Sequence, residues 1–229
     1  MANCESRPTS DGDCLSALSR FSDHCAMTCD PPQAGLSLPD ATLLEGIVST
    51  LDEHGSPHIA PMGPIVDANF NWLLLRPFRT SATFANLKRS GQGVLHVTDD
   101  VELLARAAVG RIEQMPRLER TDAVEGVILA DACRWYAFRV ESLDDRDDRT
   151  KMVARVVDRG RIRDFFGFNR AKHAVVEAAI LATRIGLLEP HYIRNEYARL
   201  AVLVEKTGGR QEHRAFSFLQ QYVNEALPT

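Results

Sequence analysis

The stretch Trp72–Lys88, WLLLRPFRTSATFANLK, changes within a few residues from an apolar strand to a short helix. Trp72–Leu75 is a continuous apolar run that is too short for a helix and is typical of a buried strand. Pro77 ends it, because its nitrogen carries no proton for a sheet ladder and its ring favours an extended conformation at Arg76. The strand is therefore predicted to stop where the basic residues begin.

A helix is predicted to follow this turn. Phe84 and Leu87 would form its apolar side, since residues three apart share one face of a helix. Gly91 follows the last helical residue, at the position where a glycine commonly ends a helix in the left-handed conformation.

The junction between strand and helix gathers two guanidinium groups and three hydroxyls, from Arg76, Arg79, Thr80, Ser81 and Thr83. A helix N-terminus offers free backbone N–H groups and the positive end of the macrodipole, and arginine binds phosphate through two parallel hydrogen bonds. The junction therefore predicts a seat for the phosphate of a small ligand. An ordinary N-cap beside surface arginines is the alternative, and this stretch alone does not separate the two.

The composition indicates an ordinary globular chain. It has 229 residues, 45% hydrophobic and 25% charged, which suits one large domain, or one domain with an appendage. A net charge of -4 gives no general attraction to nucleic acid or to an anionic membrane. No apolar run approaches the roughly 20 residues that span a bilayer. The start of the chain lacks the apolar core of a signal peptide, so we expect a cytoplasmic protein.

The cysteines are concentrated near the start of the chain. Cys25 and Cys29, with His24, have a spacing that would suit zinc, but Cys4 and Cys14 do not supply a second close pair. Unpaired thiols in an N-terminal extension are the other interpretation, and no metal site is predicted. Residues 1–40 are rich in Ser, Asp and Pro without a sustained period, so we expect a disordered extension.

Short strands separated by turns follow that extension, with helices between some of them. This arrangement predicts a mainly β protein of the α+β class, built on a small antiparallel barrel over residues 41–167. The predicted strands are 43–51, 58–62, 72–75, 93–98, 124–129, 134–143 and 151–157, with a helix at 101–109.

The period changes to that of helices near Asn169, so residues 168–229 are predicted to form a C-terminal unit of three helices. Apolar residues recur at helical spacing from Ala171 to Ile185, and Gly186 is the expected end of that helix. Pro190 opens a second helix at its first position, and a third covers 212–226.

Two features of the first hairpin favour a bound ligand. The returning strand carries two prolines and a glycine in Ala60–Pro64, a pattern typical of an irregular edge that another group approaches closely. Ser49 and Thr50 place hydroxyls in an otherwise apolar strand, where a flat aromatic ligand would find polar contacts. An irregular edge strand without a ligand explains each feature equally.

Five segments of the chain together resemble the DUF447 family, a branch of the FMN-binding split-barrel superfamily that includes flavoredoxin-like flavin reductases and pyridoxamine-phosphate oxidases. The segments are LLEGIVST (Leu43–Thr50), IAPMGPIV (Ile59–Val66), LRPFRTSATFANL (Leu75–Leu87), GVLHVTDDV (Gly93–Val101) and FGFNRAKHAVVEAAILATR (Phe166–Arg184). The resemblance covers the chain from about residue 43 to 226.

The resemblance implies a homodimer of split barrels that holds FMN near the dimer interface, with the phosphate at the loop after the third strand. Arg76 would pair with the phosphate, Arg79 would be a weaker second cation, and Thr80, Ser81 and Thr83 would bind its oxygens. The implied contacts to the isoalloxazine ring or the ribityl chain come from Val48, Ser49, Thr50, Pro64 and Phe78, the first three chiefly through backbone groups.

The leading functional interpretation is an FMN-binding flavoprotein that acts as a flavin-dependent oxidoreductase or flavin reductase, in which the flavin supplies the redox chemistry. A non-enzymatic protein that stores FMN, an accessory factor of one-carbon metabolism and a ligand-free interaction module remain alternatives.

Other polar residues are weaker candidates. His54 and His58 lie on either side of a predicted turn, and His173 and His191 belong to the helical unit, where a structural role is the simpler interpretation. Asp99 and Asp100 would form a carboxylate pair, or one of them would cap the next helix. The other polar residues considered for a functional site are Asn86, Thr98 and Cys133.

Overall fold

The computed structural model describes residues 41–227. The strands are β1 (Thr42–Leu43), β2 (Gly46–Leu51), β3 (Pro57–Met62), β4 (Ile65–Val66), β5 (Trp72–Leu75), β6 (Gln92–Val97), β7 (Leu118–Arg120), β8 (Val127–Leu129), β9 (Arg134–Asp144) and β10 (Lys151–Arg161). The helices are α1 (Ala82–Ser90), α2 (Val101–Ala108), α3 (Arg170–Ala182), α4 (Pro190–Thr207) and α5 (Arg210–Ala226). The predicted extension over residues 1–40, with His24, Cys25 and Cys29, lies outside the described residues.

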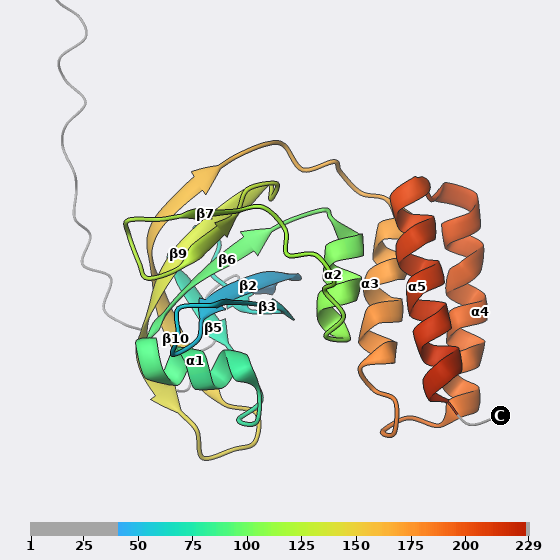
Figure 1. Cartoon of the computed structure of the whole chain (residues 1–229), viewed down its shortest axis with the longest axis horizontal. Coiled ribbons are helices and arrows are strands. Elements are labelled where there is room, and N and C mark those ends of the chain that lie inside the picture. Colours follow the sequence, from blue (N-terminus) through green and yellow to red (C-terminus); the bar gives the residue numbers. More distant parts are fainter. Residues whose placement is uncertain (1–40, 228–229) are drawn as a thin grey trace, which may run out of the picture. The chain divides into compact units, whose positions relative to one another are not determined.

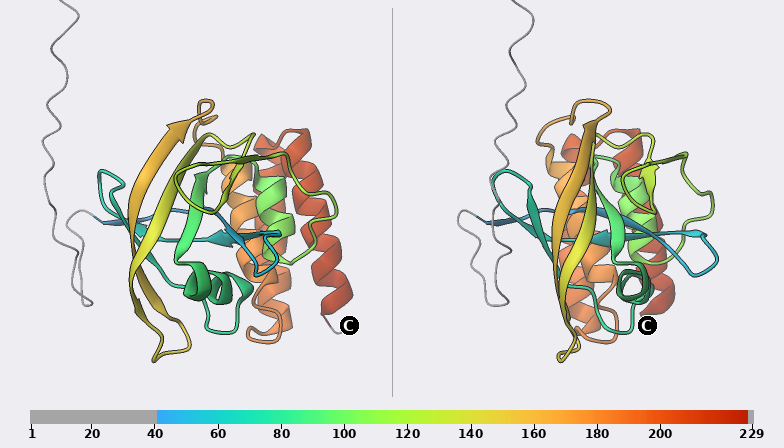
Figure 2. Two further views of the ribbon diagram at one scale, coloured as in Figure 1. Left: turned by 60° about the vertical axis from the view of Figure 1, so that its left-hand side comes forward. Right: turned by 90° about the vertical axis from the view of Figure 1, so that its left-hand side faces the viewer.

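Eight strands form one antiparallel sheet in the order β1-β4-β5-β10-β9-β6-β2-β3 (Figures 1 and 2). β1 leads into β2 and β3 leads into β4, and these two broken strands pair with each other on both sides of the break. The N–H of Leu44 continues the pairing by donating to the carbonyl of Pro64 at 3.0 Å. Because the two ends of the sheet share these strands, the sheet closes on itself. The predicted split barrel of the α+β class is confirmed.

The barrel interior is filled by alternate residues of its strands. Leu73 and Leu75 of β5 and Phe138 of β9 are completely buried in one cluster. Phe84 and Leu87 of α1 belong to the same cluster, so α1 is fixed to the barrel by the apolar side that its sequence predicts. Burial of each such side chain stabilises the fold by about 1.5–3 kcal/mol.

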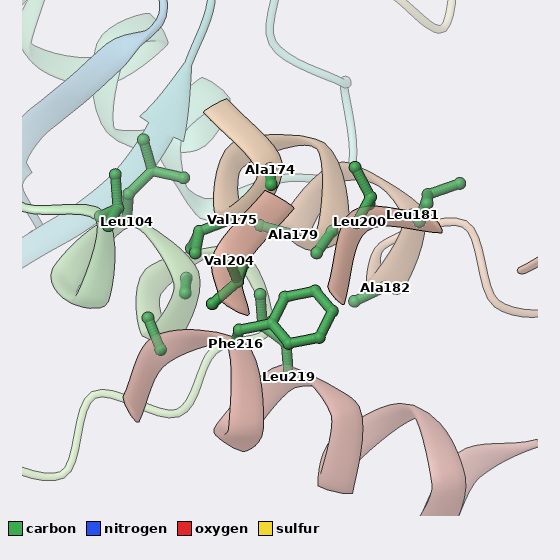
Figure 3. Close-up of a cluster of buried hydrophobic side chains, with 14 of the residues drawn as sticks. Leu104, Ala174, Val175, Ala179, Leu181, Ala182, Leu200, Val204, Phe216 and Leu219 are labelled. Carbon is green, nitrogen blue, oxygen red and sulfur yellow. The ribbon is translucent and has the colours of Figure 1, made fainter. Parts of the chain in front are cut away.

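The other faces of β2 and β3 pack on the helices. Ile47 and Ile59 point away from the barrel interior and join a second core with α2, α3, α4 and α5. Figure 1 shows α2 between the strands and the three C-terminal helices. Phe216 and Leu219 of α5 meet the alanine-rich face of α3 and Val204 of α4 (Figure 3). Small side chains on α3 allow its neighbours to approach closely.

His96 ties three strands together from inside the protein. It is completely buried, and its Nδ1 lies 3.1 Å from the carbonyl oxygen of Ile47. Its Nε2 accepts a hydrogen bond of 3.1 Å from the N–H of Leu129, so the ring proton belongs on Nδ1. Burial lowers the pKa of His96 to about 4, and the imidazole is neutral at physiological pH.

Several boundaries differ from the prediction. The first strand is divided at Leu44 and Glu45, where it passes from one end of the sheet to the other. β10 continues to Arg161 instead of ending at residue 157, because pairing with β9 extends over its polar end. α3 stops at Ala182, and Gly186 occupies its left-handed conformation (φ 84°) in the following turn. None of the helices among residues 41–227 is long and apolar enough to cross a membrane.

Candidate functional site

The turn after β5 is fastened to the connection between β9 and β10. The backbone N–H and the hydroxyl of Thr150 both donate to the carbonyl of Pro77, at 3.0 and 2.8 Å. The N–H of Arg79 donates to the carbonyl of Asp148 at 2.8 Å. Three hydrogen bonds to the β9–β10 connection therefore hold the loop that carries the basic residues.

Ser81 is the N-cap of α1. Its backbone is extended (φ −83°, ψ 149°), and its hydroxyl accepts a hydrogen bond of 3.1 Å from the N–H of Phe84. The same hydroxyl donates to the carbonyl of Phe78 at 2.7 Å, so its own proton is already engaged. Within residues 41–227 the N–H groups of Ala82 and Thr83 have no acceptor. These two groups are the free donors that the start of a helix offers to an anion.

Arg76 lies between β5 and this helix start. It is half-buried, and its Nε atom is buried without a hydrogen-bond partner among the described residues. Its guanidinium forms no ion pair within that part of the chain either. A buried donor left unsatisfied costs about 1–3 kcal/mol, and such groups are rare in folded proteins. The orphaned nitrogen therefore fits a group that accepts hydrogen bonds from it.

The other predicted phosphate contacts differ in how available they are. Thr80 is exposed, and its hydroxyl has no partner within residues 41–227. Thr83 is 2% exposed, and its Oγ1 lies 3.2 Å from Nε2 of His58 on β3. Arg79 is exposed, with Nη2 3.3 Å from a carboxylate oxygen of Asp148. An exposed pair of this kind contributes about 0–1 kcal/mol, so the guanidinium exchanges partners at little cost.

The residues predicted to bind the phosphate lie in one continuous stretch of the chain. It runs from the end of β5 through the turn into the first turn of α1, and it contains Arg76, Arg79, Thr80, Ser81 and Thr83. Phe78 belongs to the same turn, is 57% exposed, and has the guanidinium of Arg149 5.5 Å from its ring centroid.

The predicted ring contacts of β2 have partners within the protein. Val48 and Ser49 are completely buried, and both pair with β3 on one side and with β6 on the other. The hydroxyl of Ser49 donates to the carbonyl of Val127 at 2.5 Å. Thr50 pairs only with His58, and its hydroxyl accepts a bond of 2.9 Å from Nδ2 of Asn86. β2 is thus an interior strand at Val48 and Ser49, and the expected contacts of these residues and of Thr50 with the flavin ring stay a prediction.

Pro64 lies at the break between β3 and β4. It is buried, and its carbonyl accepts the bond from Leu44 that carries the pairing across the break. The neighbouring Gly63 has little room, because a Cβ there would lie 3.0 Å from Cδ2 of Leu43. Another group, the side chain of Leu43, thus approaches the backbone closely here, as the two prolines and the glycine of Ala60–Pro64 predict. The role of Pro64 toward a ligand stays a prediction.

The remaining candidates have structural partners. Asp100 caps α2 by accepting from the N–H of Leu103 at 3.0 Å. Asp99 pairs with Arg163, whose hydrogen bond holds the pKa of the Asp99 carboxyl below its usual range. Cys133 is buried, and burial raises the pKa of its thiol, which disfavours a nucleophilic role. Thr98 accepts a bond from the N–H of Asp100 at 3.1 Å.

The histidines other than His58 and His96 are peripheral to these sites. His54 is exposed in the turn between β2 and β3, and His173 stacks on Phe168 with ring centroids 6.1 Å apart. His191 lines a surface pocket between α3 and α4 with a volume of about 480 Å³. Within residues 41–227 no group of three or more His, Cys, Asp or Glu side chains is placed to hold a metal ion.

Sequence reasoning missed the contact between His58 and Thr83. The two residues are 25 positions apart, and their contact depends on how the β2–β3 hairpin packs against α1. The available signal was that Thr83 lies four residues before Leu87, on the apolar side of α1, and so faces inward.

Several solved structures are similar to this chain, one of them over most of its length. The structure of the FMN-bound DUF447 protein MM1853 from Methanosarcina mazei is 26% identical, over 81% of this chain and 95% of that chain, with a TM-score of 0.65. A flavin reductase domain protein from Arthrobacter sp. FB24 is 19% identical, over 54% and 80% of the two chains, with a TM-score of 0.47. The styrene monooxygenase flavin reductase of Pseudomonas putida S12 is 17% identical, over 52% and 80%, with a TM-score of 0.43.

A search of the curated proteins gave no match. Two family models cover most of the described residues. The model of the N-terminal domain of a protein of unknown function, DUF447, matches residues 44–163, and the model described as protein of unknown function (DUF447) matches residues 169–221. The first match alone covers more than half of the 229 residues. The chain therefore belongs to the DUF447 family.

Proposed function

We propose that the chain is an FMN-binding flavoprotein whose phosphate seat is the turn between β5 and α1. The observation that carries the proposal is the buried Nε of Arg76, which has no partner among the described residues and belongs to the turn that leads into a helix start with two free N–H groups. The oxygens of a phosphate group are acceptors suited to these three donors. The first turn of α1 contains no acidic residue that would oppose an anion.

Each residue of the seat has a distinct part in this proposal. Arg76 supplies a charge-assisted bond, while the N–H groups of Ala82 and Thr83 supply neutral ones. Thr80 adds an exposed hydroxyl that can turn toward the ligand. Ser81 acts as the N-cap: its hydroxyl accepts a hydrogen bond from the N–H of Phe84 and fixes the first turn of α1. The N–H groups of Ala82 and Thr83, which have no acceptor within residues 41–227, stay free for a ligand. Bound FMN would supply redox chemistry, and the chain would supply binding and orientation.

The likeness to MM1853 supports the proposal independently of the site. That protein is described as FMN-bound, and the similarity extends over 95% of its chain. The two lines of support differ in kind, because one rests on an unsatisfied donor in this chain and the other on a relative.

The test has two parts. The purified protein is loaded with FMN and dialysed, and visible absorption shows whether the flavin is retained. Titrations followed by fluorescence then give the affinities for FMN and for riboflavin. Riboflavin has the same ring and ribityl chain but no phosphate. A phosphate seat predicts retention of FMN and much weaker binding of riboflavin. Equal affinity for FMN and riboflavin would contradict the assignment of Arg76 and α1 to phosphate binding. Complete release of FMN would contradict FMN as the cofactor.

Arg76→Ala is the variant that addresses the seat directly. Loss of a charge-assisted hydrogen bond should weaken FMN binding by about 1.5–3 kcal/mol, roughly 10- to 150-fold, with little effect on riboflavin. Arg155→Ala is the matched control, because Arg155 lies on the neighbouring β10 and is paired with Glu141. It removes the same charge away from the seat, so it should leave both affinities unchanged.

We further propose that the flavoprotein is an oxidoreductase. The experiment adds NADH or NADPH to the FMN-loaded protein without oxygen and follows loss of the oxidised flavin spectrum, then restores it with an acceptor. No reduction by either donor would favour a storage role, and it would leave the phosphate seat intact.

A homodimer that holds the cofactor near its interface is a separate proposal, based on the family resemblance. Light scattering of the loaded protein would give the mass in solution. A monomer that retains FMN would contradict the dimer without affecting the seat.

A further inference from the structure

Two polar contacts, one buried and one partly buried, join the β2–β3 hairpin to α1. Thr50 and His58 are direct partners across the two strands. Thr50 receives a bond of 2.9 Å from Asn86, and Nε2 of His58 lies 3.2 Å from the hydroxyl oxygen of Thr83. The first contact satisfies a buried amide in the middle of the helix. The second reaches a hydroxyl in the first turn, within the proposed phosphate seat.

The Thr83 hydroxyl has one proton, and its direction depends on whether Nε2 of His58 carries a proton. Within residues 41–227 this contact is the only side-chain hydrogen bond of Thr83. If Nε2 of His58 has no proton, it accepts the hydroxyl proton of Thr83 and turns it away from a ligand. If Nε2 carries the proton, it donates to the Thr83 oxygen, and the hydroxyl proton is free for another acceptor.

A bound phosphate selects between these two arrangements. A phosphate oxygen close to Thr83 needs a donor, whereas an oxygen lone pair facing it would be repelled. Only the ring with a proton on Nε2 presents a donor from Thr83. Burial lowers the pKa of His58, so the ring is neutral at physiological pH and both arrangements are open to it before a ligand binds.

We propose that His58 is a positioning residue of the phosphate seat, which donates from Nε2 to Thr83 and so directs the Thr83 hydroxyl proton to a phosphate oxygen. This inference rests on the proposed function. It makes the β2–β3 hairpin part of the discrimination between a phosphorylated flavin and its unphosphorylated form, although the imidazole itself does not touch the ligand.

The experiment compares the ratio of FMN to riboflavin affinity in the wild-type chain, His58→Leu, His58→Gln and Thr83→Val. His58→Leu should lower the ratio about 5-fold, the effect of losing one ordinary hydrogen bond, and should leave riboflavin binding unchanged. His58→Gln should restore most of the ratio, because the glutamine amide can donate to Thr83 as Nε2 does. Thr83→Val should lower the ratio, and adding His58→Leu to it should lower the ratio no further.

Arg89→Ala is the control for loosening the same helix. Arg89 binds the carbonyls of Leu51 and Asp52 at 2.7 and 2.9 Å, so it joins α1 to the same hairpin at the end away from the seat. It should leave the ratio unchanged. An unchanged ratio in His58→Leu, an equal loss for both flavins, or additive effects with Thr83→Val would overturn the inference about His58 alone. A wild-type chain that does not prefer FMN would overturn the seat and this inference together.

Discussion

A guanidinium nitrogen buried without a partner, as in Arg76, lowers the stability of the chain that contains it. Water solvates that nitrogen in the unfolded chain, but no described residue replaces the water in the folded one. Strain and unmet polar groups are concentrated at functional sites, where a ligand supplies what the protein leaves out. In Arg76 the same atom, Nε, lowers the stability of the ligand-free protein and is the proposed donor to the phosphate.

Replacing Arg76 by methionine should therefore separate stability from binding. The methionine keeps an apolar stem and removes the unsatisfied donor, so without ligand the variant should be as stable as the wild type or up to about 1–2 kcal/mol more stable. Chemical denaturation with and without FMN measures both effects. Saturating FMN should stabilise the wild type more than the variant. A variant that is less stable without ligand would indicate that the guanidinium has a structural partner.

Single residues also show what sequence reasoning can place. The position of Arg76 between a strand and a helix start was predictable, because a strand end, a proline and a helix start are all local signals, while its role toward a phosphate stays a proposal. The roles of Ser49 and His58 were not predictable, because the bond of Ser49 to Val127 and the contact of His58 with Thr83 depend on packing between distant elements. Local chemistry predicts which side chains surround a helix start, and tertiary packing decides which of their protons are free.

At the scale of elements, α1 has a defined beginning and a defined end. Ser81 caps the first turn, and Gly91 ends the helix in the left-handed conformation (φ 65°), with its N–H bound to the carbonyl of Leu87 at 2.8 Å. The carbonyl of Gly91 in turn accepts from Val140 on β9 at 2.8 Å. The length of this helix is thus set at both ends.

Gly91→Ala should destabilise the protein by about 1 kcal/mol, the cost of a Cβ in the left-handed conformation. A Cβ there would meet nothing within 4 Å, so backbone strain and not a clash is the cause. Denaturant unfolding measures the change. Gly91→Asn is the control, since asparagine tolerates this conformation better and should cost less. A larger loss for asparagine than for alanine would contradict the explanation.

Elements with a strong local pattern were predicted closely, and elements defined by their partners were not. The strand Trp72–Leu75 and the start of the helix at Pro190 agree with the structure, because a bounded apolar run and a proline at the first helical position are local signals. The three-residue β7 (Leu118–Arg120) has no such pattern and forms only by pairing with β8.

At the scale of the whole described chain, Asp99 links the barrel to the C-terminal helices. Its side chain is 7% exposed and lies between β6 and α2, where it accepts bonds from Arg163 at 2.5 Å and from the N–H of Phe166 at 2.7 Å. The carbonyl oxygen of Asp99 accepts a hydrogen bond of 2.9 Å from Nζ of Lys172, and the same Nζ donates to Oε1 of Glu212 at 2.7 Å. One loop therefore contacts the connection to α3, α3 itself and, through Lys172, α5.

The Asp99 contacts predict a loss of stability in acid. The hydrogen bond from Arg163 lowers the pKa of Asp99 below 3.8 in the folded state, so the unfolded chain binds its proton first as the pH falls. The stabilisation is complete above about pH 4 and is lost as the pH falls through the folded value. Asp99→Asn should cost about 2 kcal/mol at pH 7 and should remove part of the pH dependence measured between pH 5 and 2. An unchanged slope would assign the acid sensitivity to other carboxylates.

The closure of the barrel also sets an order of events during synthesis on the ribosome. β2 and β3 are adjacent in the chain and can pair as soon as both have emerged. Leu75 of β5 can pair with Met152 only after β10 has been synthesised, and Gln92 of β6 can pair with Arg139 only after β9 has been synthesised. Until then the apolar side of α1 has no barrel to cover it. The last strands to be translated also carry Asp148 and Thr150 into place against the turn after β5. A ribosome that stalls before β9 would therefore expose Phe84 and Leu87 to chaperones, and the nascent chain would not yet be able to hold a flavin.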